Sequence, residues 1–171
     1  MEEEKAFMED EIMSDARKLI LAQGIRNFHE VTPWLYRGGQ PTGEGLELLK
    51  NAGIKTVVSF RWGKKTIAAE QAAVEKLGMK FISLPMYYWR LPGLEITEEF
   101  LSIVDDRSNW PLFVHCFHGA DRTGLLLAIF RIKRQSWHVD EAYREMKAKG
   151  FHRFRIRHFK WKLYQYARSL R

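Results

Sequence analysis

The sequence is poor in cysteine and has no long apolar segment. Cys116 is the only cysteine among 171 residues, so no internal disulfide can form and a secreted fold held by disulfides is excluded. A membrane-spanning helix needs roughly 20 consecutive apolar residues, and the longest candidate, residues 125–132, already contains Arg131. Residues 1–4, Met-Glu-Glu-Glu, are acidic where a secretory signal would be basic. We therefore expect a cytoplasmic protein.

Negative charge is concentrated at the N-terminal end of the chain and positive charge at the C-terminal end. The net charge is +7, yet residues 1–15 carry −6 and residues 130–171 carry +10. This asymmetry favours an anionic partner near the C-terminal half, such as phosphate groups or an acidic lipid surface. A solvated basic helix face is the alternative. Nucleic acid would also fit the charge, but no nucleic-acid-binding motif accompanies it, so we expect no nucleic-acid partner.

Strand and helix patterns alternate through the middle of the chain. This alternation predicts an α/β fold with a central, mostly parallel sheet flanked by helices. We expect a single domain over residues 28–171, preceded by an acidic helix or arm over residues 1–27. The expected strands span residues 34–37, 55–60, 81–84 and 111–115. The expected helices span residues 43–52, 66–77, 98–107 (with Thr97 as its cap), 122–135, 139–149 and 156–170.

The segment between the last strand and the next helix predicts a phosphate site. It reads His-Cys-Phe-His-Gly-Ala-Asp-Arg-Thr-Gly over residues 115–124, and we call it the cradle loop. Backbone N–H groups of Phe117, His118, Gly119 and Ala120 can point at one tetrahedral anion, aided by the positive end of the following helix. Gly119 permits a close turn of the backbone. Arg122 can donate two hydrogen bonds to phosphate oxygens.

The positive end of the following helix and the charge of Arg122 also act on the thiol of Cys116. A thiolate at a helix N-terminus beside an arginine is stabilised, so Cys116 is expected to attack phosphorus as a nucleophile at neutral pH. Thr123 can donate a hydrogen bond to the thiolate, and His115 is expected to fix the loop through backbone hydrogen bonds. An inert buried cysteine is the common alternative. A zinc site from His115, Cys116 and His118 does not match the usual ligand spacing.

The pattern His-Cys-x-x-Gly-x-x-Arg-Thr-Gly resembles the signature of the cysteine-dependent protein tyrosine phosphatases, in particular small atypical dual-specificity members. Residues 35–41 and 53–58 are similar to the opening segment of bacterial and plant-or-fungal members, and Trp137, Ala142 and Met146 match a helix after the signature. The resemblance covers residues 28 to about 155. It implies a two-step reaction through phosphocysteine, without metal or organic cofactor.

The usual aspartate acid of such phosphatases is missing, because no aspartate lies between Asp15 and Asp105. Asp121, directly before Arg122, is the first substitute; this arrangement resembles myotubularins and a mycobacterial secreted phosphatase. Its alternative role is to cap the helix or form a salt bridge. Glu95 is the second candidate. A third possibility is that the leaving group departs without a dedicated acid.

Two further segments bear on the substrate. Residues 87–90, Tyr-Tyr-Trp-Arg, could wall the pocket, with Arg90 contributing to substrate binding, or could simply form a packed loop. The basic and aromatic run at 152–162 could rest on an anionic membrane surface or hold polyphosphate. The alternative is that Ile156, Phe159, Leu163 and Tyr166 form one helix face that packs into the core. Arg37, Arg61 and Lys64 could gather further phosphate charge, but we expect each of them at the surface.

The sequence thus predicts a phosphomonoester hydrolase acting through phosphocysteine, and most favours a dual-specificity or tyrosine protein phosphatase. Phosphoinositide or inositol-polyphosphate hydrolysis is one alternative. A catalytically silent phosphate-binding module is the other, because the usual acid is absent.

Overall fold

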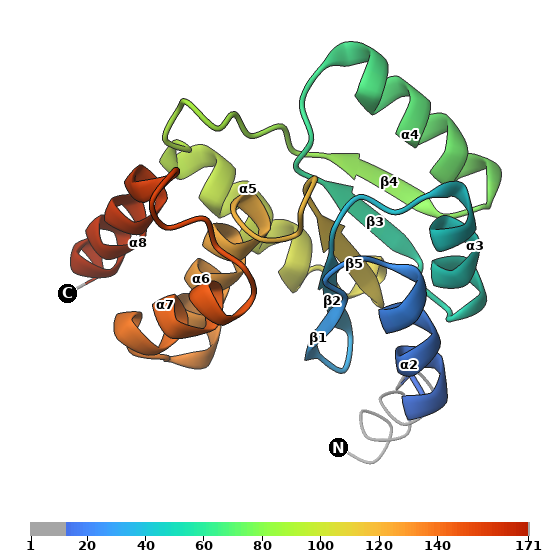
Figure 1. Cartoon of the computed structure of the whole chain (residues 1–171), viewed down its shortest axis with the longest axis horizontal. Helices are drawn as coiled ribbons and strands as arrows, with labels where there is room; N and C mark the ends of the chain where they lie inside the picture. Colours follow the sequence, from blue (N-terminus) through green and yellow to red (C-terminus); the bar gives the residue numbers. More distant parts are fainter. Residues whose placement is uncertain (1–12, 171) are drawn as a thin grey trace.

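The computed structural model describes residues 13–170, in which a five-stranded sheet lies between two groups of helices (Figure 1). The strand order is β1-β2-β5-β3-β4. The four strands β2, β5, β3 and β4 run parallel, and β1 is antiparallel to β2. The predicted fold class is therefore confirmed. The bounds are His29–Thr32 for β1, Leu35–Gly38 for β2, Thr56–Ser59 for β3, Lys80–Ser83 for β4 and Leu112–His115 for β5.

The helices divide between the two faces of the sheet, as the opposite sides of Figure 1 show. One face carries α2 (Asp15–Gly24), α3 (Gly43–Asn51) and α4 (Lys64–Lys76). The other carries α5 (Leu94–Asp105), α6 (Arg122–Gln135), α7 (Val139–Ala148) and α8 (Arg157–Ser169). None of the helices within residues 13–170 combines the length and the apolar character that crossing a membrane requires.

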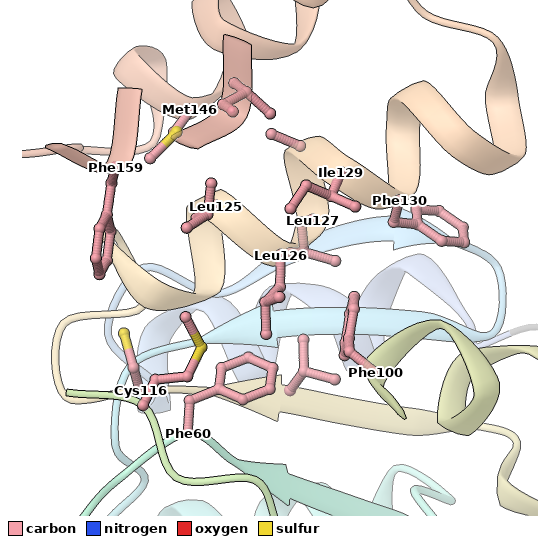
Figure 2. Packing of buried hydrophobic residues seen from close by; sticks show 14 of the residues in the cluster. Phe60, Phe100, Cys116, Leu125, Leu126, Leu127, Ile129, Phe130, Met146 and Phe159 are labelled. Carbon is pink, nitrogen blue, oxygen red and sulfur yellow. The ribbon is translucent and has the colours of Figure 1, made fainter. Parts of the chain in front are cut away.

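Strand β5 lies at the centre of the sheet and contributes to both hydrophobic clusters. Successive side chains of a strand point to opposite faces. Leu112 and Val114 accordingly pack with α5 and α6, whereas Phe113 packs with Tyr36 and Val57 on the other face. Figure 2 shows the first cluster, in which Leu126 of α6 lies toward Phe60 and Phe100, while Cys116 lies at the edge. This buried frame fixes the position at which β5 ends.

One local expectation was wrong, and one strand was missed. Thr97 does not cap a helix but lies buried inside α5, which begins three residues earlier, after Pro92-Gly93, with Gly93 as the N-cap residue. The hydroxyl of Thr97 donates to the carbonyl of Gly93 at 3.5 Å, so it serves within the first turn. Strand β1 was not predicted, because four residues without clear alternation give too weak a pattern.

Part of the predicted N-terminal arm belongs to the structured body. Residues 1–12 lie outside the described residues. Within residues 13–27, helix α2 begins after Ser14, whose hydroxyl accepts a hydrogen bond from the N–H of Arg17. Leu21 and Ile25 are buried in the same cluster as Phe28. A domain boundary at residue 28 stays a prediction. Residues 13–27 pack on the face of the sheet that also carries α3 and α4.

Candidate active site

The cradle loop joins the end of β5 to the start of α6, and several of its carbonyl groups accept hydrogen bonds from outside the loop. The carbonyl of His115 accepts from the N–H of Phe60 at 2.9 Å, and that of Phe117 accepts from the N–H of Gln40 at 3.0 Å. Because a planar trans peptide places N–H opposite C=O, the N–H groups that follow these carbonyls point to the interior of the loop. Inward N–H groups at a helix N-terminus form an anion-binding concavity.

Gly119 and Arg37 hold the turn of the loop. The Arg37 guanidinium donates from Nη2 to the carbonyl of Gly119 at 2.8 Å, and Asn27 Nδ2 donates to the same carbonyl at 3.2 Å. Gly119 has a φ of +70°, and a Cβ there would lie 2.3 Å from the backbone carbon of Gly38. Only glycine therefore fits this position. Burial lowers the pKa of Arg37 to about 10, which leaves it cationic beneath the loop at neutral pH.

Cys116 and Arg122 occupy the two ends of the cradle. The Cys116 side chain is fully buried. Arg122 Nη1 donates to the carbonyls of Phe60 and Met86, at 3.1 and 3.2 Å, and its guanidinium lies 4.3 Å from the ring centre of Tyr88. Arg122 Nε and the Thr123 hydroxyl are buried without a hydrogen-bond partner among the described residues. Such donors suit an anion held in the cradle.

Glu70 of α4 holds the side chain of His115 in place. Its Nδ1 lies 3.2 Å from the carbonyl of Cys116, which agrees with the expected backbone contact, and its Nε2 lies 2.6 Å from Glu70 Oε1. Ser59 and Gln40 also donate to the Glu70 carboxylate, each at 2.8 Å. Burial would raise the pKa of Glu70, but these hydrogen bonds outweigh burial and lower it. The carboxylate therefore stays ionised and orients the residue before Cys116.

Asp121 is the N-cap residue of α6, but its side chain makes no capping hydrogen bond. Its carboxylate is 1% exposed and accepts two hydrogen bonds from His152, which follows α7. The N–H of His152 donates to Oδ1 and its ring Nδ1 contacts Oδ2, both at 2.9 Å. Asp121 was the first of the two predicted general acids, and it lies in the cradle loop next to Arg122 and lines the cavity beside the loop. Glu95 is exposed in the first turn of α5 and is not among the residues that line the cavity beside the loop.

A cavity of about 430 Å³ opens beside the cradle loop, lined by Tyr88, Trp89, His118, Asp121, His152, Arg155, Ile156 and His158. Trp89 also contacts Trp62 and Tyr87, with ring centres 5.1 and 5.3 Å away, in an exposed aromatic group. Arg90 follows Trp89, is exposed, and does not line the cavity. The predicted wall role of this segment therefore fits Tyr88 and Trp89 better than Arg90.

The structure brings nine predicted site residues together in one loop, residues 115–123, but sequence reasoning missed three that support them. Arg37 was expected at the surface and is 2% exposed beneath the loop. Glu70 and His152 were missed because each lies more than 30 residues from the group it contacts and no motif marks it. Within residues 13–170, no cluster of three or more histidine, cysteine or acidic side chains could hold a metal ion.

Comparison with known proteins places this geometry among phosphatases. The family described as DSP-PTPase phosphatase fused to NAD+ kinase matches residues 22–162. The dual specificity protein phosphatase TpbA of Pseudomonas aeruginosa is 33% identical over 125 residues, which are 73% of this chain and 55% of that protein. The chain therefore spans little more than half the length of this curated relative.

Solved structures share the fold. A crystal structure of P. aeruginosa TpbA in complex with pTyr superposes with a TM-score of 0.68 at 25% identity, over 84% of this chain and 90% of that one. A putative phosphatase from Shewanella putrefaciens superposes with a TM-score of 0.72 at 22% identity, over 86% and 92% of the two chains. The second likeness concerns the fold alone.

Proposed function

The chain belongs to the DSP-PTPase phosphatase family, and from this premise we propose that it hydrolyses phosphate monoesters, with phosphotyrosine in proteins as its main substrate. The observation that carries the proposal is the cradle loop, whose carbonyls are bound from outside while Cys116 and Arg122 stand at its two ends. TpbA is named a dual specificity protein phosphatase, which favours protein substrates over phosphoinositides, inositol polyphosphates or silent phosphate binding.

In the first step, the Cys116 thiolate attacks phosphorus and the bond from phosphorus to the leaving oxygen breaks. The inward N–H groups of residues 117–120 and the Arg122 guanidinium bind the phosphoryl oxygens, where charge develops. The leaving oxygen takes a proton from the Asp121–His152 pair. The product of this step is phosphocysteine and the free alcohol or phenol.

In the second step, water attacks phosphorus and the sulfur–phosphorus bond breaks. The Asp121–His152 pair takes the proton from water, and the Thr123 hydroxyl donates a hydrogen bond to the departing thiolate. Inorganic phosphate is released and the thiolate is restored. Because this nucleophile must stay reduced, we place the protein in a reducing compartment such as the cytoplasm.

The rim of the cavity supports an aryl substrate. Tyr88 and Trp89 line the cavity, and the face of an aromatic ring attracts another ring in stacked or edge-on arrangements. The related phosphatase TpbA has been crystallised in complex with pTyr. Arg90, exposed next to Trp89, is suited to acidic residues flanking the phosphotyrosine. Tyrosine phosphate should therefore be preferred to serine phosphate.

Phosphate release from two peptides of identical sequence, one with phosphotyrosine and one with phosphoserine, tests this proposal. We expect kcat/KM to be at least about tenfold higher for phosphotyrosine, since one ring contact of about 1.4 kcal/mol accounts for that factor. Para-nitrophenyl phosphate serves as the reference substrate. Absence of phosphate release from all three compounds would refute hydrolysis, and equal rates on the peptides would refute the preference for tyrosine.

We also propose that the basic C-terminal helix contacts an anionic membrane. One face of α8, which includes Phe159 and Leu163, is buried in the core. This is the alternative that the apolar spacing in this segment predicted. Its other face joins a basic aromatic patch in which Phe154 is 81% and Trp161 63% exposed. The patch consists of Tyr143, Lys147, Arg153, Phe154, Arg157, Lys160 and Trp161. Exposed aromatic rings among cations are typical of membrane interfaces.

Co-sedimentation with phosphatidylserine vesicles tests the patch. We expect binding to these vesicles, little binding to phosphatidylcholine vesicles, and loss of binding at high salt because the attraction is screened. The double variant Phe154→Ala/Trp161→Ala should bind roughly tenfold more weakly. Leu19→Ala is the control, because it removes an apolar side chain of α2 that is 61% exposed, close to the 63% of Trp161. Equal binding to both vesicle types would refute the proposal.

A further inference from the structure

We infer that His152 is the residue that exchanges protons with the substrate and with water, and that Asp121 is its positioning residue. The inference deepens the proposed function and rests on it. It assigns the role of the missing aspartate acid to a histidine that lies after α7, 31 residues beyond the cradle-loop carboxylate it contacts.

The surroundings of Asp121 suit a positioning residue. The side chain is 1% exposed, and both of its oxygens face donors on His152, the backbone N–H and the ring Nδ1, at 2.9 Å. Two contacts to the same residue fix both the position of the His152 backbone and the orientation of its ring. The buried carboxylate therefore holds the more exposed imidazole at the cavity.

The surroundings of His152 suit proton exchange. Its side chain is 45% exposed and lines the cavity beside the cradle loop together with Tyr88 and His118. With Nδ1 held by Asp121, the opposite ring nitrogen, Nε2, is available to the cavity. Histidine changes its charge near neutral pH more readily than other side chains. A histidine oriented by a buried carboxylate is also the usual arrangement of a general acid and base.

The other polar side chains near His152 are histidine, arginine, lysine and asparagine. His118 lies in the loop with its ring centre 5.4 Å away, and Arg155 and His158 line the same cavity. Arg26 and Lys149 line a second cavity that His152 also borders. Asp121 is the one carboxylate among the described residues that line these two cavities, so it is the group that orients the His152 ring through Nδ1.

Two other histidines, His118 and His158, line the cavity. Nε2 of His158 lies 2.5 Å from the carbonyl of Tyr88, so that nitrogen is already engaged. His118 is a poorer donor than His152. Burial, and then the charges of Arg26 and His152, lower its pKa, so His118 is neutral near pH 7. Its ring Nδ1 has no hydrogen-bond partner in the described part of the chain, so no carboxylate orients it. Only His152 combines a carboxylate partner with exposure to the cavity.

The proton balance closes over the two steps. In the first, Nε2–H of His152 gives its proton to the leaving oxygen as the phosphorus–oxygen bond breaks, and the ring becomes neutral. In the second, neutral Nε2 takes a proton from the attacking water as the sulfur–phosphorus bond breaks. One water is consumed, and His152 regains its starting state.

The test compares His152→Gln and Asp121→Asn with the wild type on aryl and alkyl phosphates. An aryl oxygen is a good leaving group and hardly needs a proton, whereas an alkyl oxygen does. We expect His152→Gln to lose roughly 10²- to 10⁴-fold in kcat/KM on phosphoserine peptide and only a few-fold on para-nitrophenyl phosphate. The alkaline limb of the wild-type pH profile on phosphoserine peptide should vanish in His152→Gln, because the histidine is the group that titrates near neutral pH.

The control is His138→Gln. His138 forms a similar but exposed pair with Asp140, at 3.4 Å, at the N-terminus of α7, and its loss should leave both substrates unaffected. If His152→Gln keeps the alkyl rate and the alkaline limb while Asp121→Asn loses them, Asp121 is the acid and the inference is wrong. If His152→Gln does not fold, a wild-type profile without an alkaline limb would still refute it. Failure of the wild type on para-nitrophenyl phosphate would refute the proposed function instead.

Discussion

Replacing Cys116 with serine is expected to abolish hydrolysis while leaving phosphate binding intact. The side chain is fully buried at the end of β5, and serine is slightly smaller, so the loop should keep its shape. A serine hydroxyl lacks the thiolate character that makes the cysteine a nucleophile. Loss of a nucleophile costs enzymes roughly 10⁴- to 10⁶-fold in kcat, and we expect a loss of that order for para-nitrophenyl phosphate.

Binding is measured separately from turnover. The inward N–H groups and Arg122 remain in Cys116→Ser, so inorganic phosphate should raise the melting temperature of variant and wild type by similar amounts. This equality is the control, because a collapsed loop would lose the stabilisation by phosphate. Hydrolysis by Cys116→Ser at a rate near the wild type would rule out Cys116 as the nucleophile.

The local parts of this site could be predicted from the sequence because all their determinants are neighbours in the chain. A β-branched and apolar run ending at His115, a glycine at the turn and a helix starting at Arg122 together specify strand, loop and helix. The family resemblance inferred from this segment is confirmed by the match over residues 22–162. The central, mostly parallel sheet follows from the same alternation of strands and helices.

The supporting contacts could not be predicted, because they join segments distant in sequence. Arg37 lies 82 residues from the Gly119 carbonyl that it binds, and a cation on a short strand gives no sign that it is buried. From the sequence, helix capping is the obvious structural role for Asp121, because a helix is predicted to begin at the next residue, Arg122. Its actual partner, His152, follows a different helix, and only the packing of α7 against α6 brings the two together.

Replacing Arg122 with lysine is expected to remove most activity even though the charge is kept. Arg122 is 1% exposed; its Nη1 donates to the carbonyls of Phe60 and Met86, and its guanidinium carbon lies 4.3 Å from the ring centre of Tyr88. These contacts fix Nη1 of the guanidinium and leave its other nitrogens, Nε and Nη2, to donate to phosphate oxygens. A lysine ammonium is a point charge that cannot do both. We expect kcat/KM for para-nitrophenyl phosphate to fall roughly 10²- to 10⁴-fold, or about 3 to 5 kcal/mol.

Arg131→Lys is the matched control, because Arg131 lies on the same helix and is held as firmly outside the site. Its guanidinium donates to both carboxylate oxygens of Glu145, at 3.0 and 2.7 Å, and to the carbonyl of Val31 at 3.0 Å, and it lies 4.4 Å from the ring centre of Trp137. Arg131→Lys should lower the melting temperature while kcat/KM stays within a few-fold of the wild type. Equal losses of activity in both variants would mean that α6 packing, rather than phosphate binding by Arg122, explains the effect.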